Sequence, residues 1–180
     1  MVSSGKDFIF CHPTADIDTS ATTIIRGAFE FQGQKCSAAS RAYIPHSVWE
    51  RMGTRLITET ESISMGDPRD FTNFMSAVID QRAFDKITAH IARARNDPSC
   101  EIVTGGGSDD TEGWFIEPTI IVSTDPRSET MVEEIFGPVL TIHLYDDGSF
   151  DEILVECDAA SPYALTGSIF SSNEVNVQRA

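Results

Sequence analysis

Apolar residues recur along the chain at two spacings that alternate from one end to the other. Short continuous apolar runs predict buried strands, and apolar residues at every third or fourth position predict helices with one buried face. Strands are expected at residues 8–10, 41–44, 101–104, 114–122, 139–145 and 165–171. Helices are expected at residues 16–33, 80–96 and 151–159. A further helix is expected after Pro45, with Val48, Met52 and Leu56 on its buried face.

Polar residues at the ends of these helices agree with the apolar pattern. Asp16 and Asp80 can each cap a helix, because a side-chain oxygen there accepts a hydrogen bond from a free backbone N–H. Gly33 is expected to end the first helix, and Asn173 is expected to cap a last helix. The alternation of strands and helices predicts an α/β layered domain with a mostly parallel sheet.

Length and charge limit the classes of function. At 180 residues the chain is expected to form one domain. Its net charge of −15 would repel both nucleic acid and an anionic membrane, so neither is expected as a partner. No apolar stretch approaches the roughly 20 residues that cross a bilayer. The cysteines and histidines are scattered without the spacing of a metal site, so no metal is expected, and separated thiols favour a reducing compartment.

Cys36 is the strongest candidate for a chemical role. It follows the helix stop at Gly33, and its neighbours Gln34, Lys35 and Ser37 are all polar. A thiol beyond a helix end lies where a substrate can reach it, and the positive charge of Lys35 would favour the reactive thiolate. The partial negative charge at the helix end would oppose that ionisation. The alternative interpretation is a small, buried and unreactive side chain.

The segment around Cys36 resembles the nucleophile motif of the NAD(P)-dependent aldehyde dehydrogenase family, in which phenylalanine precedes a Gly-Gln-x-Cys turn. Four further segments resemble motifs of this family and follow in the same order. They are residues 65–68, 113–119, 133–139 and 163–167. The neighbouring residues, at 5–8, 33–38 and 76–80, are most similar to the 1-pyrroline-5-carboxylate dehydrogenase branch of the family, which acts on L-glutamate γ-semialdehyde.

The resemblance implies a fold and a set of site residues. The fold would be a three-layer catalytic domain of the aldehyde dehydrogenase type. Cys36 would be the nucleophile, Glu134 would bind the nicotinamide ribose, and Phe136 would pack against the nicotinamide. Ser37 would help to hold the carboxylate end of the substrate, and Lys35 belongs to the same substrate-binding set. The implied cofactor is NAD.

The chain departs from the family pattern at its start. Val2 stands where the family has the glutamate that acts as general base. Residues 1–4 are therefore expected to be a non-native start. Residues 5–180 are expected to be the thiol-bearing catalytic domain, cut at both ends and without the NAD-binding domain.

The expected function is that of a fragment of an NAD-dependent dehydrogenase. The parent would oxidise L-glutamate γ-semialdehyde to L-glutamate in proline breakdown through a cysteine thiohemiacetal and thioester, and the isolated chain is expected to be inactive. Two alternatives stay open, namely an aldehyde dehydrogenase of other substrate preference and a non-catalytic interaction module of the same fold. The expected partners are a small aldehyde and, for the parent, further copies of itself. The parent is expected in the mitochondrial matrix if it is eukaryotic, and otherwise in the cytoplasm.

Overall fold

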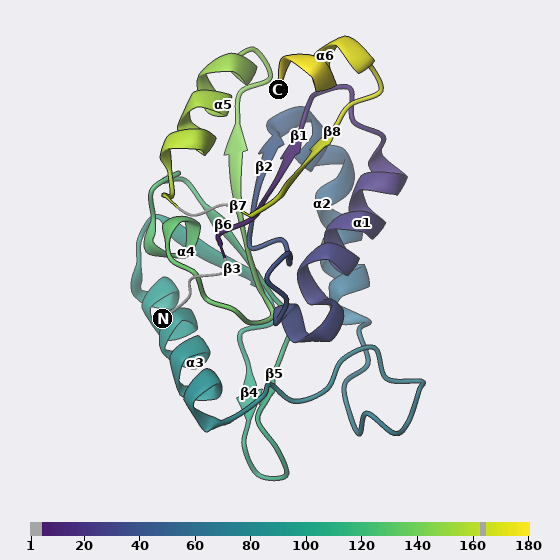
Figure 1. Ribbon diagram of the computed structural model, residues 1–180, viewed down its shortest axis with the longest axis vertical. Helices are drawn as coiled ribbons and strands as arrows, with labels where there is room; N and C mark the ends of the chain where they lie inside the picture. The colour runs from purple at the N-terminus through teal and green to yellow at the C-terminus, as the bar shows by residue number, and fades with distance from the viewer. Residues whose placement is uncertain (1–4, 163–164) are drawn as a thin grey trace.

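A mixed sheet with helices on both faces forms the centre of the molecule (Figure 1). The computed structural model describes residues 5–162 and 165–180. Within these residues the main sheet has six strands in the order β3-β6-β7-β2-β1-β8. They are β1 (Phe8–Cys11), β2 (Arg41–Pro45), β3 (Cys100–Thr104), β6 (Thr119–Ser123), β7 (Val139–Tyr145) and β8 (Gly167–Phe170). Neighbouring strands are parallel except for β3 and β6, which confirms the predicted mostly parallel sheet.

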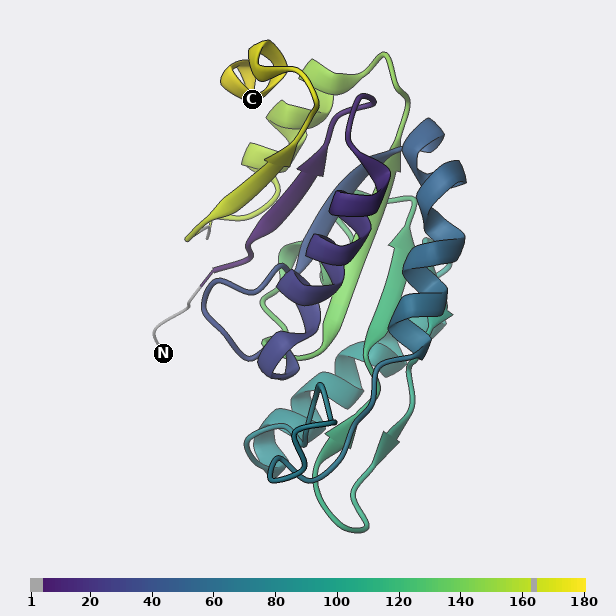
Figure 2. The same cartoon turned by 90° about the vertical axis from the view of Figure 1, so that its right-hand side faces the viewer.

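The helices form the two outer layers. Helices α1 (Ile17–Phe29) and α2 (His46–Glu61) cover one face, which is turned to the viewer in Figure 2. Helices α3 (Gln81–Asn96), α4 (Glu129–Val132) and α5 (Phe150–Ala159) cover the other face. The short helix α6 (Glu174–Arg179) lies beyond the end of β8. Helix α4 has only four residues, and the apolar spacing did not predict it.

Successive residues of each strand enter opposite layers of the core. Ile9 packs in the cluster beneath α1 and α2, whereas Phe10 packs in the cluster beneath α5. Ala42 and Ile44 likewise face α1 and α2, and Tyr43 between them faces α5. Side chains alternate along a strand, so a strand with both faces covered is apolar at most of its positions. This explains the continuous apolar runs in the sequence.

The helix starts lie where the polar residues predicted them. Asp16 accepts a hydrogen bond from Thr19 N at 2.8 Å, and Asp80 accepts one from Ala83 N at 2.8 Å. Asn173 caps α6 in the same way.

The predicted end of the first helix is wrong. Helix α1 ends at Phe29, and the 3₁₀ turn η1 (Glu30–Gly33) follows it. Phe31 and Gln32 inside this turn have φ of 55° and 58°, a left-handed conformation that no α-helix contains. The apolar spacing ends at Phe29 as well, so Gly33 ends the turn rather than the helix.

The predicted strand at 114–122 is two separate strands. Strand β5 (Phe115–Ile116) pairs with β4 (Ser108–Asp109) in a small antiparallel ribbon, and the chain then enters the main sheet as β6. Pro118 lies between β5 and β6. Proline has no N–H to give to a neighbouring strand, so the pairing is interrupted there.

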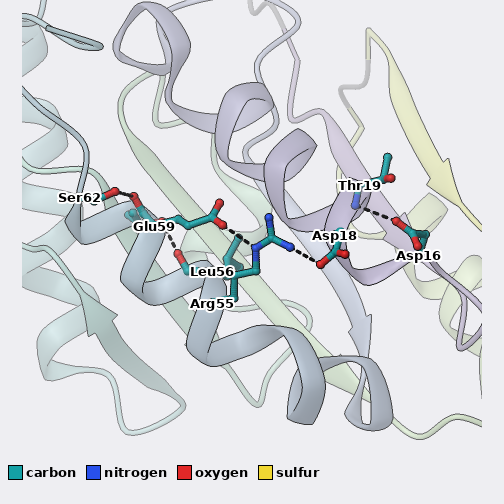
Figure 3. A network of polar contacts seen from close by, with 8 residues as sticks. Asp16, Asp18, Thr19, Arg55, Leu56, Glu59 and Ser62 are labelled. Atoms are coloured by element: carbon teal, nitrogen blue, oxygen red, sulfur yellow. Dashed lines mark hydrogen bonds and ion pairs between the residues drawn. The ribbon is translucent and has the colours of Figure 1, made fainter. Parts of the chain in front are cut away.

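Polar contacts on the surface join α1 to α2 (Figure 3). Arg55 of α2 donates to Asp18 of α1 and to Glu59 on its own helix. Exposed ion pairs of this kind contribute about 1 kcal/mol or less. The apolar cluster beneath these helices therefore contributes more to their packing than the ion pairs do. None of the helices in the described part of the chain is long and apolar enough to cross a bilayer.

Candidate functional site

Three segments far apart in the sequence meet at one edge of the sheet because each of them leads into one of three adjacent parallel strands. Residues 5–7 precede β1, residues 34–40 precede β2, and residues 133–138 precede β7. The order in the sheet is β7-β2-β1. The amino ends of adjacent parallel strands lie side by side, so these three loops are neighbours. All five residues predicted for the site lie in two of these loops, 34–40 and 133–138.

The predicted nucleophile lies on a tight, exposed turn. Three consecutive residues, Phe31, Gln32 and Gly33, have φ between 55° and 63°. Cys36 and Ser37 are both exposed on this turn. Left-handed backbone at residues other than glycine costs free energy, and such conformations cluster at functional sites. The structure thus confirms the predicted exposure of Cys36.

The remaining cysteines are less exposed than Cys36. All four cysteines are in the described residues and all are free, but only Cys36 is exposed. Cys11 and Cys157 are buried, and burial raises the pKa of Cys11 to about 12 and that of Cys157 to about 11. Thiolate is the reactive form of cysteine. Neither buried thiol is therefore available for chemistry near neutral pH.

The ammonium group of Lys35 pairs with a carboxylate on the preceding turn. Its Nζ lies 3.3 Å from Glu30 Oε2, and Glu30 is also paired with Arg26. The hydrogen bonds from Arg26 and then from Lys35 hold the pKa of Glu30 below its ordinary value. Lys35 also lines the crevice described below.

Glu134 and Phe136 form the facing wall. The carboxylate of Glu134 is half-buried and accepts a hydrogen bond from Gly5 N at 3.1 Å. Lys86 on α3 donates to the backbone carbonyl of Glu134 at 2.6 Å. Phe136 has φ of 61°, and 36% of its surface is exposed. These contacts present a carboxylate and an aromatic ring at the same edge of the sheet as the cysteine turn.

A narrow crevice separates the cysteine turn from the Glu134 loop. Its cavity volume is about 10 Å³, roughly the space of one water molecule. Its lining consists of Gly5, Gly33, Lys35, Ala38, Ala39, Ser40, Glu134, Phe136 and Gly137. On the other side of Phe136 lies a wider and more open hollow, also lined by Gln34, Ile79 and Lys86. Cys36 and Ser37 lie on the exposed turn next to these spaces and line neither of them.

The floor of the site contains a buried amine. Lys6 is fully buried and donates to Ser40 Oγ at 2.7 Å. Burial, with the charge of Arg41 as the next cause, lowers the pKa of Lys6 to about 7, although Glu134 raises it slightly. The backbone carbonyl of Lys6 accepts a hydrogen bond from Arg41 Nε at 3.0 Å. Side chains with strongly perturbed pKa values cluster at functional sites. The lowered pKa of Lys6, close to the carboxylate of Glu134, therefore makes Lys6 a candidate functional residue.

Sequence reasoning did not assign roles to Lys6, Ser40, Gln32 or Gln34. Gln32 and Gln34 lie within the cysteine motif, and this was a signal that could have found them. Nothing in the local pattern shows that Lys6 is buried, because its neighbours Gly5 and Asp7 are not apolar. Val2, which the resemblance places at the position of the family's general base, lies outside the described residues, as do 163 and 164 of the last motif.

In the described part of the chain no three histidine, cysteine or acidic residues lie close enough together to hold a metal ion. A hollow with a volume of about 250 Å³ lies near the end of α2, where Glu61 and Glu117 contribute to its lining. It contains none of the predicted site residues.

Comparisons with known proteins agree with the motifs. The whole chain, residues 1–180, matches the family model described as "Aldehyde dehydrogenase family". The chain is 51% identical over 178 residues to "Delta-1-pyrroline-5-carboxylate dehydrogenase, mitochondrial" of Dictyostelium discoideum. The aligned region covers 99% of this chain and 32% of that protein. It is 46% identical over 177 residues to the human protein of the same name. This aligned region covers 98% of this chain and 31% of the human protein.

Solved structures show the same relationship. The chain is similar to the Delta-pyrroline-5-carboxylate dehydrogenase from Mycobacterium tuberculosis bound with NAD, with a TM-score of 0.90 and 44% identity over 97% of this chain and 31% of that one. It is also similar to 1-pyrroline-5-carboxylate dehydrogenase from Thermus with bound NAD, with a TM-score of 0.88 and 33% identity over 98% of this chain and 33% of that one. The chain spans about a third of the length of the curated relatives that it matches.

Proposed function

Because the chain belongs to the aldehyde dehydrogenase family and has the three-layer fold expected of its catalytic domain, we propose that it is the thiol-bearing part of an NAD-dependent enzyme. The reaction is the oxidation of L-glutamate γ-semialdehyde to L-glutamate. The observation that carries this proposal is the exposed Cys36 next to a crevice formed by Glu134 and Phe136. The similarity to dehydrogenases with this substrate, over almost the whole chain, supports the choice of aldehyde.

Cys36 carries out the covalent chemistry in this proposal. Its thiolate attacks the aldehyde carbon and forms a thiohemiacetal, and later a thioester, on the exposed turn. The backbone N–H of Cys36 can donate to the oxygen that becomes negative during the attack. Ser37 and Lys35 are close along the chain and hold the carboxylate end of the substrate.

Two residues at the rim of the crevice have the chemistry to bind the nicotinamide end of NAD. Glu134 offers a half-buried carboxylate, which can accept hydrogen bonds from the ribose hydroxyls. Phe136 offers a partly exposed ring against which the nicotinamide can pack. When bound, NAD accepts the hydride that leaves the substrate carbon. The residues of this chain bind and orient this end of the cofactor.

The remaining parts of the reaction lie outside this chain in our proposal. The chain offers a site for one end of the cofactor only, and the position of the family's general base holds Val2. We therefore assign the adenine site and the base to a longer parent protein with an NAD-binding domain. We place this parent in a homo-oligomer, and in the mitochondrial matrix if it is eukaryotic, in keeping with the names of its eukaryotic relatives.

Absorbance of NADH tests the proposal directly. The parent protein should reduce NAD with L-glutamate γ-semialdehyde, and Cys36→Ala should abolish this activity while Cys100→Ala, a substitution in strand β3, should retain it. The 180-residue chain by itself should produce no NADH, because loss of a general base alone costs about 10²- to 10⁴-fold. Turnover by the Cys36→Ala parent would refute the assignment of the nucleophile.

A panel of aldehydes separates the alternatives. If the parent oxidises unrelated aldehydes as well as or better than the semialdehyde, it is an aldehyde dehydrogenase of another preference. If it oxidises none of them although Cys36 reacts with a thiol reagent, the fold serves as a non-catalytic interaction module.

A further inference from the structure

The side chain of Gln34 joins three segments that surround the site. Its Oε1 accepts a hydrogen bond from Ile79 N at 2.9 Å, and its Nε2 donates to the carbonyl of Phe136 at 3.4 Å. Gln34 itself lies two residues before Cys36. A single amide therefore connects the cysteine turn, the segment before α3 and the loop that carries Glu134 and Phe136.

Gln32 makes a similar pair of bonds but to only one of these segments. Its Oε1 accepts from Ser76 N at 3.1 Å, and its Nε2 donates to the carbonyl of Ala77 at 3.2 Å. It thus holds the cysteine turn to the segment before α3. None of its bonds reaches the loop at Phe136.

The two loops that Gln34 joins are in close backbone contact. A Cβ atom added to Gly33 would lie 2.3 Å from the carbonyl oxygen of Gly137, so only glycine fits there. Gly33 has φ of 63° and Phe136 has φ of 61°. Left-handed backbone of this kind persists only where surrounding contacts determine it. The Gln34 amide supplies one such contact across the gap between the loops.

We infer that Gln34 is a positioning residue, which sets the Phe136 loop against the Cys36 turn and so fixes the nicotinamide side of the crevice relative to the thiol. This inference rests on the proposed function. Small displacements of reacting groups are costly in rate, because the reaction needs the hydride donor and acceptor at a defined separation. The role concerns the chemical step and not the affinity for the aldehyde.

Gln34→Glu and Gln32→Glu form a matched pair for the test. Each substitution adds one negative charge, keeps the oxygen that accepts from a backbone N–H, and replaces the donor NH₂ by an oxygen that faces a carbonyl. Only Gln34→Glu breaks a bond to Phe136. In the parent protein we expect Gln34→Glu to lower kcat about tenfold or more, equivalent to about 1.4 kcal/mol, with KM for the aldehyde within about twofold. Gln32→Glu should change kcat less than about threefold. Equal effects of the two substitutions on kcat would overturn the inference.

Hydrogen exchange gives a readout that does not depend on activity. In the 180-residue chain, Gln34→Glu should speed amide exchange in residues 133–138, whereas Gln32→Glu should speed it only in residues 74–80. If the wild-type parent shows no oxidation of the semialdehyde but exchange follows this pattern, the proposed function fails and the link between the loops stands. If exchange in 133–138 is the same in both variants, the positioning role is refuted whatever the activity.

Discussion

At the scale of single residues, the site combines a thiol at the surface with an amine beneath it. Cys36 is exposed, whereas Lys6 is completely buried and pairs with Ser40. The groups whose charges act on Lys6 are Arg41 and Lys86, which lower its pKa, and Glu134 and Glu133, which raise it. Because burial dominates, the amine has a pKa of about 7 in the folded chain, against an ordinary value of 10.5.

The low pKa of Lys6 predicts a stability that depends on pH. Between about pH 7 and 10.5 the unfolded lysine binds a proton that the folded one lacks, so this group makes the free energy of unfolding rise with pH. Below pH 7 Lys6 is protonated in both states, and its burial then lowers the free energy of unfolding by the full amount. That amount is about 1.4 kcal/mol for each unit by which the pKa is lowered. Lys6→Met should therefore gain more stability relative to wild type at about pH 6 than at about pH 9.5. Urea unfolding at both pH values measures the difference.

Ser40→Ala serves as the control for this experiment. It removes the hydrogen-bond partner of Lys6 but keeps the amine, so its stability should retain the same rise with pH. A gain in Lys6→Met that is equal at both pH values would contradict the depressed pKa.

Exposure predicts which cysteine reacts. Near neutral pH iodoacetamide should label Cys36 well before Cys11 and Cys157, which are buried and have raised pKa values. Peptide mapping by mass spectrometry after timed labelling measures the order. All the cysteines should label at similar rates in denaturant, which controls for the intrinsic reactivity of each peptide. Slower labelling of Cys36 in the folded chain would show that its turn is covered.

At the scale of elements, helix α3 supports the loop of Glu134 and Phe136. Ile87 of this helix is fully buried, and a Cβ atom on Gly137 would lie 2.4 Å from its Cδ1 atom. Lys86, the preceding residue, holds the Glu134 carbonyl. The loop therefore depends on the position of a helix whose start is set by the Asp80 cap.

Removal of that cap should destabilise the chain. Asp80→Ala leaves the backbone N–H of Ala83 without its carboxylate partner, and we expect a loss of about 1 kcal/mol in the free energy of unfolding. Asp85→Ala removes the same charge from an exposed position of the same helix and should change stability by less than about 0.5 kcal/mol. Urea unfolding of the two variants gives the comparison. Equal losses would mean that charge, and not capping, stabilises the start of α3.

At the scale of the whole molecule, two features of the surface have opposite effects on self-association. Strand β8 is at one edge of the sheet, and apolar side chains near it, Leu165, Val175 and Val177, are exposed. Unpaired strand edges and apolar surface favour association. The net charge of −15 opposes it by repulsion between copies.

Salt should shift this balance toward association. Raising the salt to about 1 M shortens the screening length to about 3 Å, so the mass measured by light scattering should increase and should fall again on dilution. Ser168→Lys places a charge on the exposed edge of β8 and should reduce the association. Thr22→Lys adds the same charge to an exposed position of α1 as a control. A monomer at every salt and protein concentration would contradict the prediction.

Much of the fold could be predicted because its signals are local. The periods of the apolar pattern located the main strands and four helices, and Asp16, Asp80 and Asn173 cap the helices as expected. The failures also have local reasons that the apolar pattern did not weigh. The left-handed residues after Phe29 end α1 early, and Pro118 divides an apolar run into two strands.

The sequence by itself determined the type and approximate position of the main strands and of α1, α2, α3 and α5, the exposed turn of Cys36 and the order of motifs that indicates the family. Those properties depend on residues within a few positions of one another. The tertiary structure decided that the segments before β1, β2 and β7 meet at one edge, that Lys6 is buried there and that Gln34 reaches Phe136. Gln34 and Phe136 are 102 positions apart in the sequence. No local pattern contains such a contact, because it arises only when helices carry the chain from one parallel strand to the next.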